Sequence, residues 1–177
     1  LSEGLVLEIY RNGLIYQQKY ERGKPSTELV VIGNTPKRGT KVSFLPDAEI
    51  FEETSFNFDL ISARSRELAF LNRGLRISVR DERDGLENLF CYEGGIQSFV
   101  TYLNKNKTVL YEKPIYLTGE KEGVKLEVAF QYNDGFNEKI FCFANNINTE
   151  EGGTHLIGFK SALTRSINNY AINNNLF

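Results

Sequence analysis

Residue types that could do chemistry gather most densely between residues 140 and 159. An apolar run is followed by a polar, asparagine-rich turn and then by Gly152-Gly153, where a helix can begin. Side-chain amides and the free N–H groups of a helix start suit an anion or a docking carboxylate. The single histidine, His155, follows Thr154. The simplest interpretation is a helix that Thr154 caps, with His155 in its first turn, and a functional role for His155 is the alternative.

The other titratable residues suggest no catalytic constellation. Carboxylates occur as immediate neighbours, as in Glu52-Glu53, Asp81-Glu82 and Glu150-Glu151, and adjacent residues do not share a face of a helix or a strand. One histidine is too few for a histidine-based metal site or a repeated acid–base pair. The sequence also has no Walker-type phosphate loop, GxGxxG, GxSxG or HExxH. We therefore predict no catalytic residue and no metal ligand in this chain.

The composition is that of an ordinary globular protein. Of 177 residues, 41% are hydrophobic and 25% are charged, and no apolar run approaches the roughly 20 residues of a membrane-spanning helix. The net charge of −2 disfavours a protein that wraps nucleic acid with its whole surface, but it allows a local basic face. Cys91 and Cys142 lie in apolar stretches without CxxC spacing, which predicts buried free thiols and a reducing, cytoplasmic setting.

The N-terminal part has the pattern of an antiparallel sheet. Residues 5 to 11 and 14 to 21 carry apolar side chains in near alternation on either side of Asn12-Gly13, a dipeptide typical of a type I′ hairpin turn. Further strands are predicted at 28 to 32 and 40 to 45, which gives a four-stranded patch. An amphipathic helix is predicted from Asp59 to Leu71.

The C-terminal part mixes strands and helices. Strands are predicted at 75 to 80 and 86 to 92, and a helix resumes at Ile96 after Gly94-Gly95, so we place a domain boundary between Glu93 and Gly95. The remaining predicted elements are strands at 114 to 119, 124 to 132 and 139 to 146, and a helix from about Thr154. The fold class predicted from this order is α+β.

Six sequence stretches resemble one family in order along the chain. The most specific is Asn-Asn-Ile-Asn-Thr-Glu-Glu-Gly-Gly-Thr-His at 145 to 155; the others lie at 20 to 25, 39 to 47, 66 to 72, 92 to 96 and 131 to 135. They resemble the ATP-driven subunits of bacterial type II DNA topoisomerases, the family of DNA gyrase B and its topoisomerase IV counterpart. The resemblance implies that residues 1–94 are the C-terminal half of a GHKL-type ATPase domain, an α/β sandwich. It implies that residues 95–177 begin a transducer domain with a small β-α-β fold.

The resemblance also assigns residues on the nucleotide side. Thr40 would help to bind adenine and Val42 would line the base pocket, while Arg11 would stand at the pocket mouth, where the family contacts aminocoumarin inhibitors. A hydroxyl beside a purine edge and a branched side chain beside its face are chemically suited to this task. Without the resemblance, Thr40 and Val42 are alternating strand residues and Arg11 is an exposed hairpin charge.

On the last helix, the resemblance assigns Lys160 and Arg165 to a cavity that captures a DNA duplex. Cations there would act on phosphates without reading the base sequence. A solvated helix face is the alternative interpretation. Lys160 stands where the family pattern leads us to expect arginine, so the charge is kept and a bidentate phosphate contact is lost.

The resemblance implies a subunit that couples ATP binding and hydrolysis to DNA strand passage and supercoiling. ATP and magnesium would be the cofactors of the full-length protein, and DNA, an A-type topoisomerase subunit and a second copy of the subunit would be its partners. The family's general base, magnesium ligand and γ-phosphate lysine match no position here, so we expect the isolated segment to be inactive. The alternatives are a topoisomerase IV subunit that decatenates, and a free-standing α+β interaction module without nucleotide.

Overall fold

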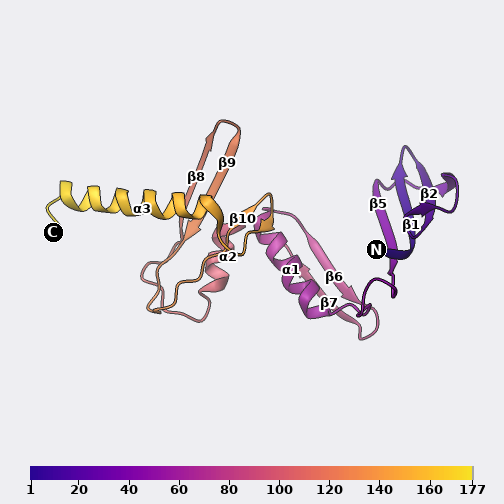
Figure 1. The fold of residues 1–177 in the computed structure, drawn as a ribbon, viewed down its shortest axis with the longest axis horizontal. Helices are drawn as coiled ribbons and strands as arrows, with labels where there is room; N and C mark the ends of the chain where they lie inside the picture. Colours follow the sequence, from indigo (N-terminus) through magenta and orange to yellow (C-terminus); the bar gives the residue numbers. More distant parts are fainter. Residues whose placement is uncertain (177) are drawn as a thin grey trace. The chain divides into compact units, whose positions relative to one another are not determined.

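The structure, a computed structural model, describes residues 1–176 and is an α+β fold (Figure 1). Packing divides the chain into two units, the first from Leu1 to Asn57 and the second from Phe58 onward. The elements of the first unit are β1 (Ser2–Arg11), β2 (Leu14–Glu21), β3 (Lys24–Pro25), β4 (Val30–Asn34) and β5 (Gly39–Pro46). The elements of the second unit are α1 (Phe58–Leu71), β6 (Ile77–Asp81), β7 (Leu86–Phe90), α2 (Gly95–Leu103), β8 (Ile115–Lys121), β9 (Val124–Phe130), β10 (Phe143–Ala144), β11 (Ile147–Asn148) and α3 (Gly153–Asn173).

The first unit is one antiparallel sheet built around the β1–β2 hairpin. Its strands run β3-β2-β1-β5, and β4 also pairs with β2, so the sheet has five strands and not the four predicted. Pairing of β1 with β2 is continuous from Gly4↔Glu21 to Arg11↔Leu14. Asn12 and Gly13 both have positive φ, 54° and 79°. This is the geometry of a type I′ turn, whose twist matches that of the flanking strands, and it confirms the predicted hairpin.

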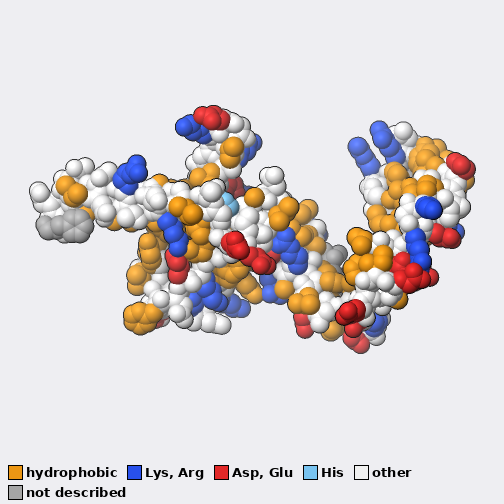
Figure 2. Space-filling view, viewed as in Figure 1, with side chains coloured by type: hydrophobic (Ala, Val, Ile, Leu, Met, Phe, Trp, Pro, Cys, Tyr) orange, Lys and Arg blue, Asp and Glu red, His pale blue; other side chains and the backbone are white. Residues whose placement is uncertain are grey.

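One face of this sheet is apolar and open. Side chains that alternate along β1 and β5 place Leu7, Ile9, Val42 and Phe44 on the same side, and Val42 and Phe44 are 54% and 55% exposed. Hydrophobic side chains are visible over these strands in Figure 2. Among the described residues of the first unit, no hydrophobic side chain is buried. A sheet normally buries its apolar face against a second layer, so this unit lacks the layer that its pattern calls for.

The second unit is organised around the C-terminal half of α1. Helix α1 packs against β6, β7 and α2, and Phe70 is its largest buried side chain with 1% exposure. The Phe70 ring stacks on Tyr92 at 3.7 Å between centroids and on Phe99 of α2 at 5.0 Å. These aromatic contacts join the segment before Gly95 to the helix that follows it, and both belong to the second packing unit. The division into an ATPase part and a transducer part at 94/95 stays a prediction.

Helix α2 and the β8–β9 hairpin are joined by a chain of side-chain amides. The buried Asn104, just after α2, donates to Gln131 Oε1 at 3.0 Å and accepts from Asn133 Nδ2 at 2.9 Å. Gln131 in turn donates to the carbonyl oxygen of Tyr111 at 2.7 Å. Burial of these amides is tolerated because each has a partner.

The predicted strand at 139 to 146 and the predicted burial of the two thiols were wrong. The predicted strand at 139 to 146 is only the two-residue β10, paired with the two-residue β11. The apolar residues before it serve packing instead, since the Phe141 ring lies 5.3 Å from that of Phe99. Cys91 is exposed, because it follows the buried Phe90 and alternation turns it to the other side, while Cys142 is partly buried.

Candidate functional sites

Helix α3 presents the first candidate site, and Gly152 sets where the helix begins. Gly152 has φ 80°, a conformation that favours glycine, and a Cβ there would lie 2.5 Å from Leu156 Cδ2, so the leucine side chain would have to shift. Gly152 is also the N-cap residue, with no side-chain cap hydrogen bond. The predicted Thr154 cap is therefore wrong, since Thr154 lies within the helix. His155 is exposed in the first turn.

The aromatic contact of α3 with the rest of the second unit lies in its first half. The ring of Phe159 lies 6.0 Å from that of Phe130 on β9, while Ile167 and Tyr170 in the second half are 51% and 65% exposed. The helix is therefore anchored to β9 near its start. Its last three turns are left with both polar and apolar surface exposed.

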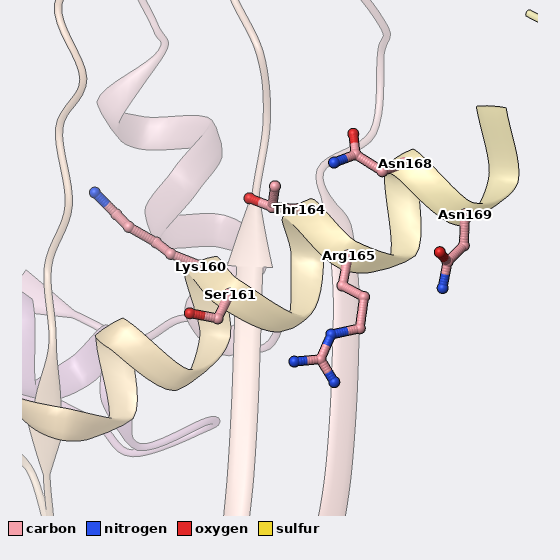
Figure 3. A pocket seen from close by; sticks show the side chains of 6 residues that line it. All are labelled: Lys160, Ser161, Thr164, Arg165, Asn168 and Asn169. Carbon is pink, nitrogen blue, oxygen red and sulfur yellow. The ribbon is translucent and has the colours of Figure 1, made fainter. Parts of the chain in front are cut away.

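The polar surface of α3 forms a shallow hollow of about 530 Å³ (Figure 3). Two cations, two hydroxyls and two amides line it, and all come from successive turns of the helix: Lys160, Ser161, Thr164, Arg165, Asn168 and Asn169. Spacing of four residues places them in two neighbouring rows along the helix. Such donors suit phosphate oxygens, and they carry no information about base sequence.

Lys160 and Arg165 differ in their ion pairs within the protein. Lys160 Nζ lies 3.0 Å from Glu138 Oε2, and the two side chains are 48% and 68% exposed. An exposed pair of this kind contributes only about 0–1 kcal/mol, so a phosphate can compete with Glu138 for Lys160. Arg165 is exposed and makes no ion pair with residues 1–176. The structure thus brings both predicted cations to one helix surface and leaves Arg165 the more available of the two.

Strand β5 presents the second candidate site. Thr40 pairs with Ile9 and Val42 pairs with Leu7 on β1, so both residues stand on the open apolar face of the first unit. Arg11, at the end of β1, shares that face by alternation. The strand register therefore brings the three predicted nucleotide-side residues onto one surface, with Lys41 on the opposite side.

The opposite side of the sheet carries a polar cluster that the sequence did not suggest. Tyr10 donates to Glu8 Oε2 at 2.6 Å, and Lys41 Nζ lies 3.8 Å from the same oxygen. The hydrogen bond from Tyr10, followed by the charge of Lys41, lowers the pKa of Glu8, and the same bond raises the pKa of Tyr10. Side-chain alternation alone could have placed these residues on one face. The Lys41–Glu8 pair joins β5 to β1 across this side of the sheet.

Two general features of the described chain bear on cofactors and setting. No group of three or more His, Cys, Asp or Glu residues lies together within residues 1–176. No helix in the same range is long and apolar enough to cross a membrane.

The sequence is similar to known proteins along its whole length. A family model described as DNA gyrase B matches residues 95–177. A DNA gyrase B protein of Myxococcus xanthus is 55% identical over 171 residues, 97% of this chain, and one of Halalkalibacterium halodurans is 54% identical over 179 residues, 100% of this chain. The chain spans only 21% and 28% of the length of these relatives.

The fold is also similar to a solved structure. The crystal structure of the 43K ATPase domain of Thermus thermophilus gyrase B in complex with an aminocoumarin matches with a TM-score of 0.88 and 41% identity. The match covers 100% of this chain and 49% of that one.

Proposed function

This chain belongs to the DNA gyrase B family, and from that premise we propose that it is part of a subunit that couples ATP binding and hydrolysis to DNA strand passage and supercoiling. The observation that carries the proposal is the strand register that gathers Arg11, Thr40 and Val42 on one open apolar face. A purine base needs an apolar surface for its faces and a few hydrogen-bonding groups for its edge. That face of the first unit offers both.

On the nucleotide side, Val42 would lie against the base and the Thr40 hydroxyl would bond its edge, directly or through water. Arg11, at the exposed end of β1, would border the pocket mouth. The similar Thermus thermophilus structure contains an aminocoumarin, and we propose that Arg11 is the residue of this chain that such an inhibitor would contact.

The phosphate chemistry of the reaction belongs to other parts of the full-length protein. Phosphoryl transfer depends on placed cations, a base and usually magnesium. Within residues 1–176 no group of three or more carboxylates, histidines or cysteines lies together, and we propose that the groups that hold magnesium belong to other parts of the full-length protein. We propose that this segment alone does not hydrolyse ATP.

On the DNA side, we propose that Lys160 and Arg165 contact the phosphates of a captured duplex. The neighbouring hydroxyls and amides of the α3 hollow would add neutral hydrogen bonds to the same backbone. The partners of the full-length protein would then be DNA, an A-type topoisomerase subunit and a second copy of the subunit, in the cytoplasm.

The test uses the full-length subunit with its A-type partner. Relaxed circular DNA should become negatively supercoiled when ATP is present and should stay relaxed without ATP. ATP-dependent decatenation without supercoiling would identify a topoisomerase IV subunit instead. Failure to bind either nucleotide or DNA would favour a free-standing interaction module.

A further inference from the structure

A polar clasp connects helix α1 to the tight turn between β10 and β11. The clasp consists of Arg64 and Asn72 on one side and Asn146 on the other. Arg64 Nη2 donates to the Asn146 carbonyl oxygen at 2.9 Å, and Asn146 Nδ2 donates to Asn72 Oδ1 at 3.0 Å. The turn is thus held at two points, in the middle of α1 and at its end.

Both sides of the clasp are themselves fixed. Asn72 donates its own amide to the Leu68 carbonyl at 2.8 Å, which orients its oxygen toward the turn. Arg64 is paired with Glu67 one turn further along α1. These contacts limit the rotamers of Arg64 and Asn72, so less side-chain entropy is lost when they hold the turn.

The residue types in the turn indicate that the side chain of Asn146 has a specific role. Asn145 and Asn146 have φ 49° and 65°, as a type I′ turn requires. Glycine adopts such a φ with the least strain, and asparagine is tolerated at some cost. At position 146 the amide makes the bond to Asn72, whereas the amide of Asn145 makes no hydrogen bond to the described part of the chain.

The turn is connected to the start of α3 by a short, bonded segment. Thr149 N donates to the Cys142 carbonyl at 2.8 Å and closes the hairpin, and Gly152 N donates to the Thr149 carbonyl at 2.8 Å. Helix α3 begins at the next residue, Gly153. A displacement of the turn relative to α1 would therefore move the start of α3, the helix that carries Lys160 and Arg165.

We propose that Arg64, Asn72 and Asn146 are positioning residues that hold the start of α3 relative to α1 and so couple nucleotide use by the subunit to the α3 surface. The inference rests on the proposed function, because coupling requires a subunit that uses ATP at one site and binds DNA at another. The clasp touches neither substrate. Its loss should lower the efficiency of coupling and leave nucleotide turnover by itself intact.

The first experiment compares Asn146→Gly with Asn145→Gly in the full-length subunit with its A-type partner. Both changes suit a positive φ, and only the first removes the bond to Asn72. Since one hydrogen bond is worth roughly a twofold to tenfold change in an equilibrium, we expect Asn146→Gly to reduce the supercoils introduced per ATP about threefold to tenfold. ATP turnover without DNA should stay within about twofold of wild type, and Asn145→Gly should behave as wild type.

A second pair of variants separates positioning from folding. Asn72→Asp and Asn72→Leu both lose the amide that bonds Leu68, and only aspartate keeps an oxygen for Asn146. Asn72→Asp should retain coupling, Asn72→Leu should match Asn146→Gly, and the double variant Asn72→Leu with Asn146→Gly should be no worse than either change alone. The comparison of Asn72→Asp with Asn72→Leu also tests the clasp proposal if Asn146→Gly fails to fold.

The outcomes distinguish the two proposals. A wild-type subunit that never supercoils DNA would sink the proposed function. The clasp proposal alone would be overturned if the wild-type subunit supercoils DNA and coupling is equal in the two variants of a pair. The pairs are Asn146→Gly with Asn145→Gly, and Asn72→Asp with Asn72→Leu. An equal loss of DNA-free ATP turnover and supercoiling in Asn146→Gly would also overturn it.

Discussion

The most informative perturbation of the α3 surface is removal of the Arg165 charge by Arg165→Gln. Arg165 has no ion pair with residues 1–176, so its full charge is available to a phosphate. Neutralising one phosphate contributes about 0.9 to the slope of log affinity against log salt concentration. Arg165→Gln should therefore lower the magnitude of this slope by about 0.9. When the salt rises from 50 to 200 mM, a fourfold change, the DNA affinity of the variant should fall about 3.5-fold less than that of wild type.

Lys160 should contribute less than Arg165, because Glu138 competes with DNA for its charge. Lys160→Gln is expected to lower the magnitude of the salt slope by less than about 0.9. Glu138→Gln should raise DNA affinity and steepen the slope, because it frees Lys160. In the Glu138→Gln background, Lys160→Gln should then have the full effect.

The assay is fluorescence anisotropy of a labelled duplex titrated with the full-length subunit at several salt concentrations from 50 to 200 mM, with a non-hydrolysable nucleotide present. Arg76→Gln is the matched control, since Arg76 is an exposed arginine between α1 and β6. Equal slopes for Arg165→Gln and wild type would refute the assignment of α3 to DNA. An equal drop for Arg76→Gln would refute the claim that the α3 surface is special.

Three further predictions concern the sheet, the core and a turn. Thr40→Val in the full-length subunit keeps the shape and removes the hydroxyl, so calorimetry should show nucleotide affinity lowered by about twofold to tenfold, with Ser43→Ala on the opposite face unchanged. Phe70→Ala removes a ring that is 1% exposed and should cost about 3–5 kcal/mol, seen as faster amide hydrogen exchange throughout α1 and α2. The hydrogen bond from Arg83 holds the pKa of Asp81 at about 2, below the ordinary 3.8, so the stabilisation from this pair is present above about pH 3.8 and is lost as the pH falls toward 2. A carboxyl NMR titration should show that pKa rising toward 3.8 in Arg83→Gln.

Local signals in the sequence predicted most of the elements. Asn12-Gly13 predicts its hairpin because the dipeptide itself accepts positive φ, and the apolar spacing between residues 59 and 71 predicts α1 to within one residue. These features depend on neighbours within a few residues. The failures arose where a distant partner decides the structure. Residues 139 to 142 have a strand pattern, yet within the described residues no strand pairs with them, and Phe141 packs on α2 instead.

The candidate sites follow the same rule. Alternation along β1 and β5 was enough to suggest that Thr40 and Val42 share a face, since strands have a period of two. The Lys160–Glu138 pair joins positions 22 apart, and the contact of Arg64 with Asn146 joins positions 82 apart. No pattern in a single sequence indicates such pairs, because loop and turn geometry brings them together.

The packing of Phe70 bears on how the second unit can move. The sequence pattern divides the chain at Gly95, and the family model begins there, yet Phe70 stacks on Tyr92 before that point and on Phe99 after it. A stacked ring can slide over its neighbour with little loss of dispersion energy, whereas a hydrogen bond weakens steeply with angle and distance. Sliding at this seam would therefore be opposed by directional bonds, namely the Arg66–Tyr102 hydrogen bond of 2.7 Å between α1 and α2 and the clasp at Asn146. Phe70 therefore contributes mainly to stability, and the clasp contributes mainly to the placement of the β10–β11 turn on α1. Phe70→Leu should lower stability more than coupling, whereas Asn146→Gly should lower coupling more than stability.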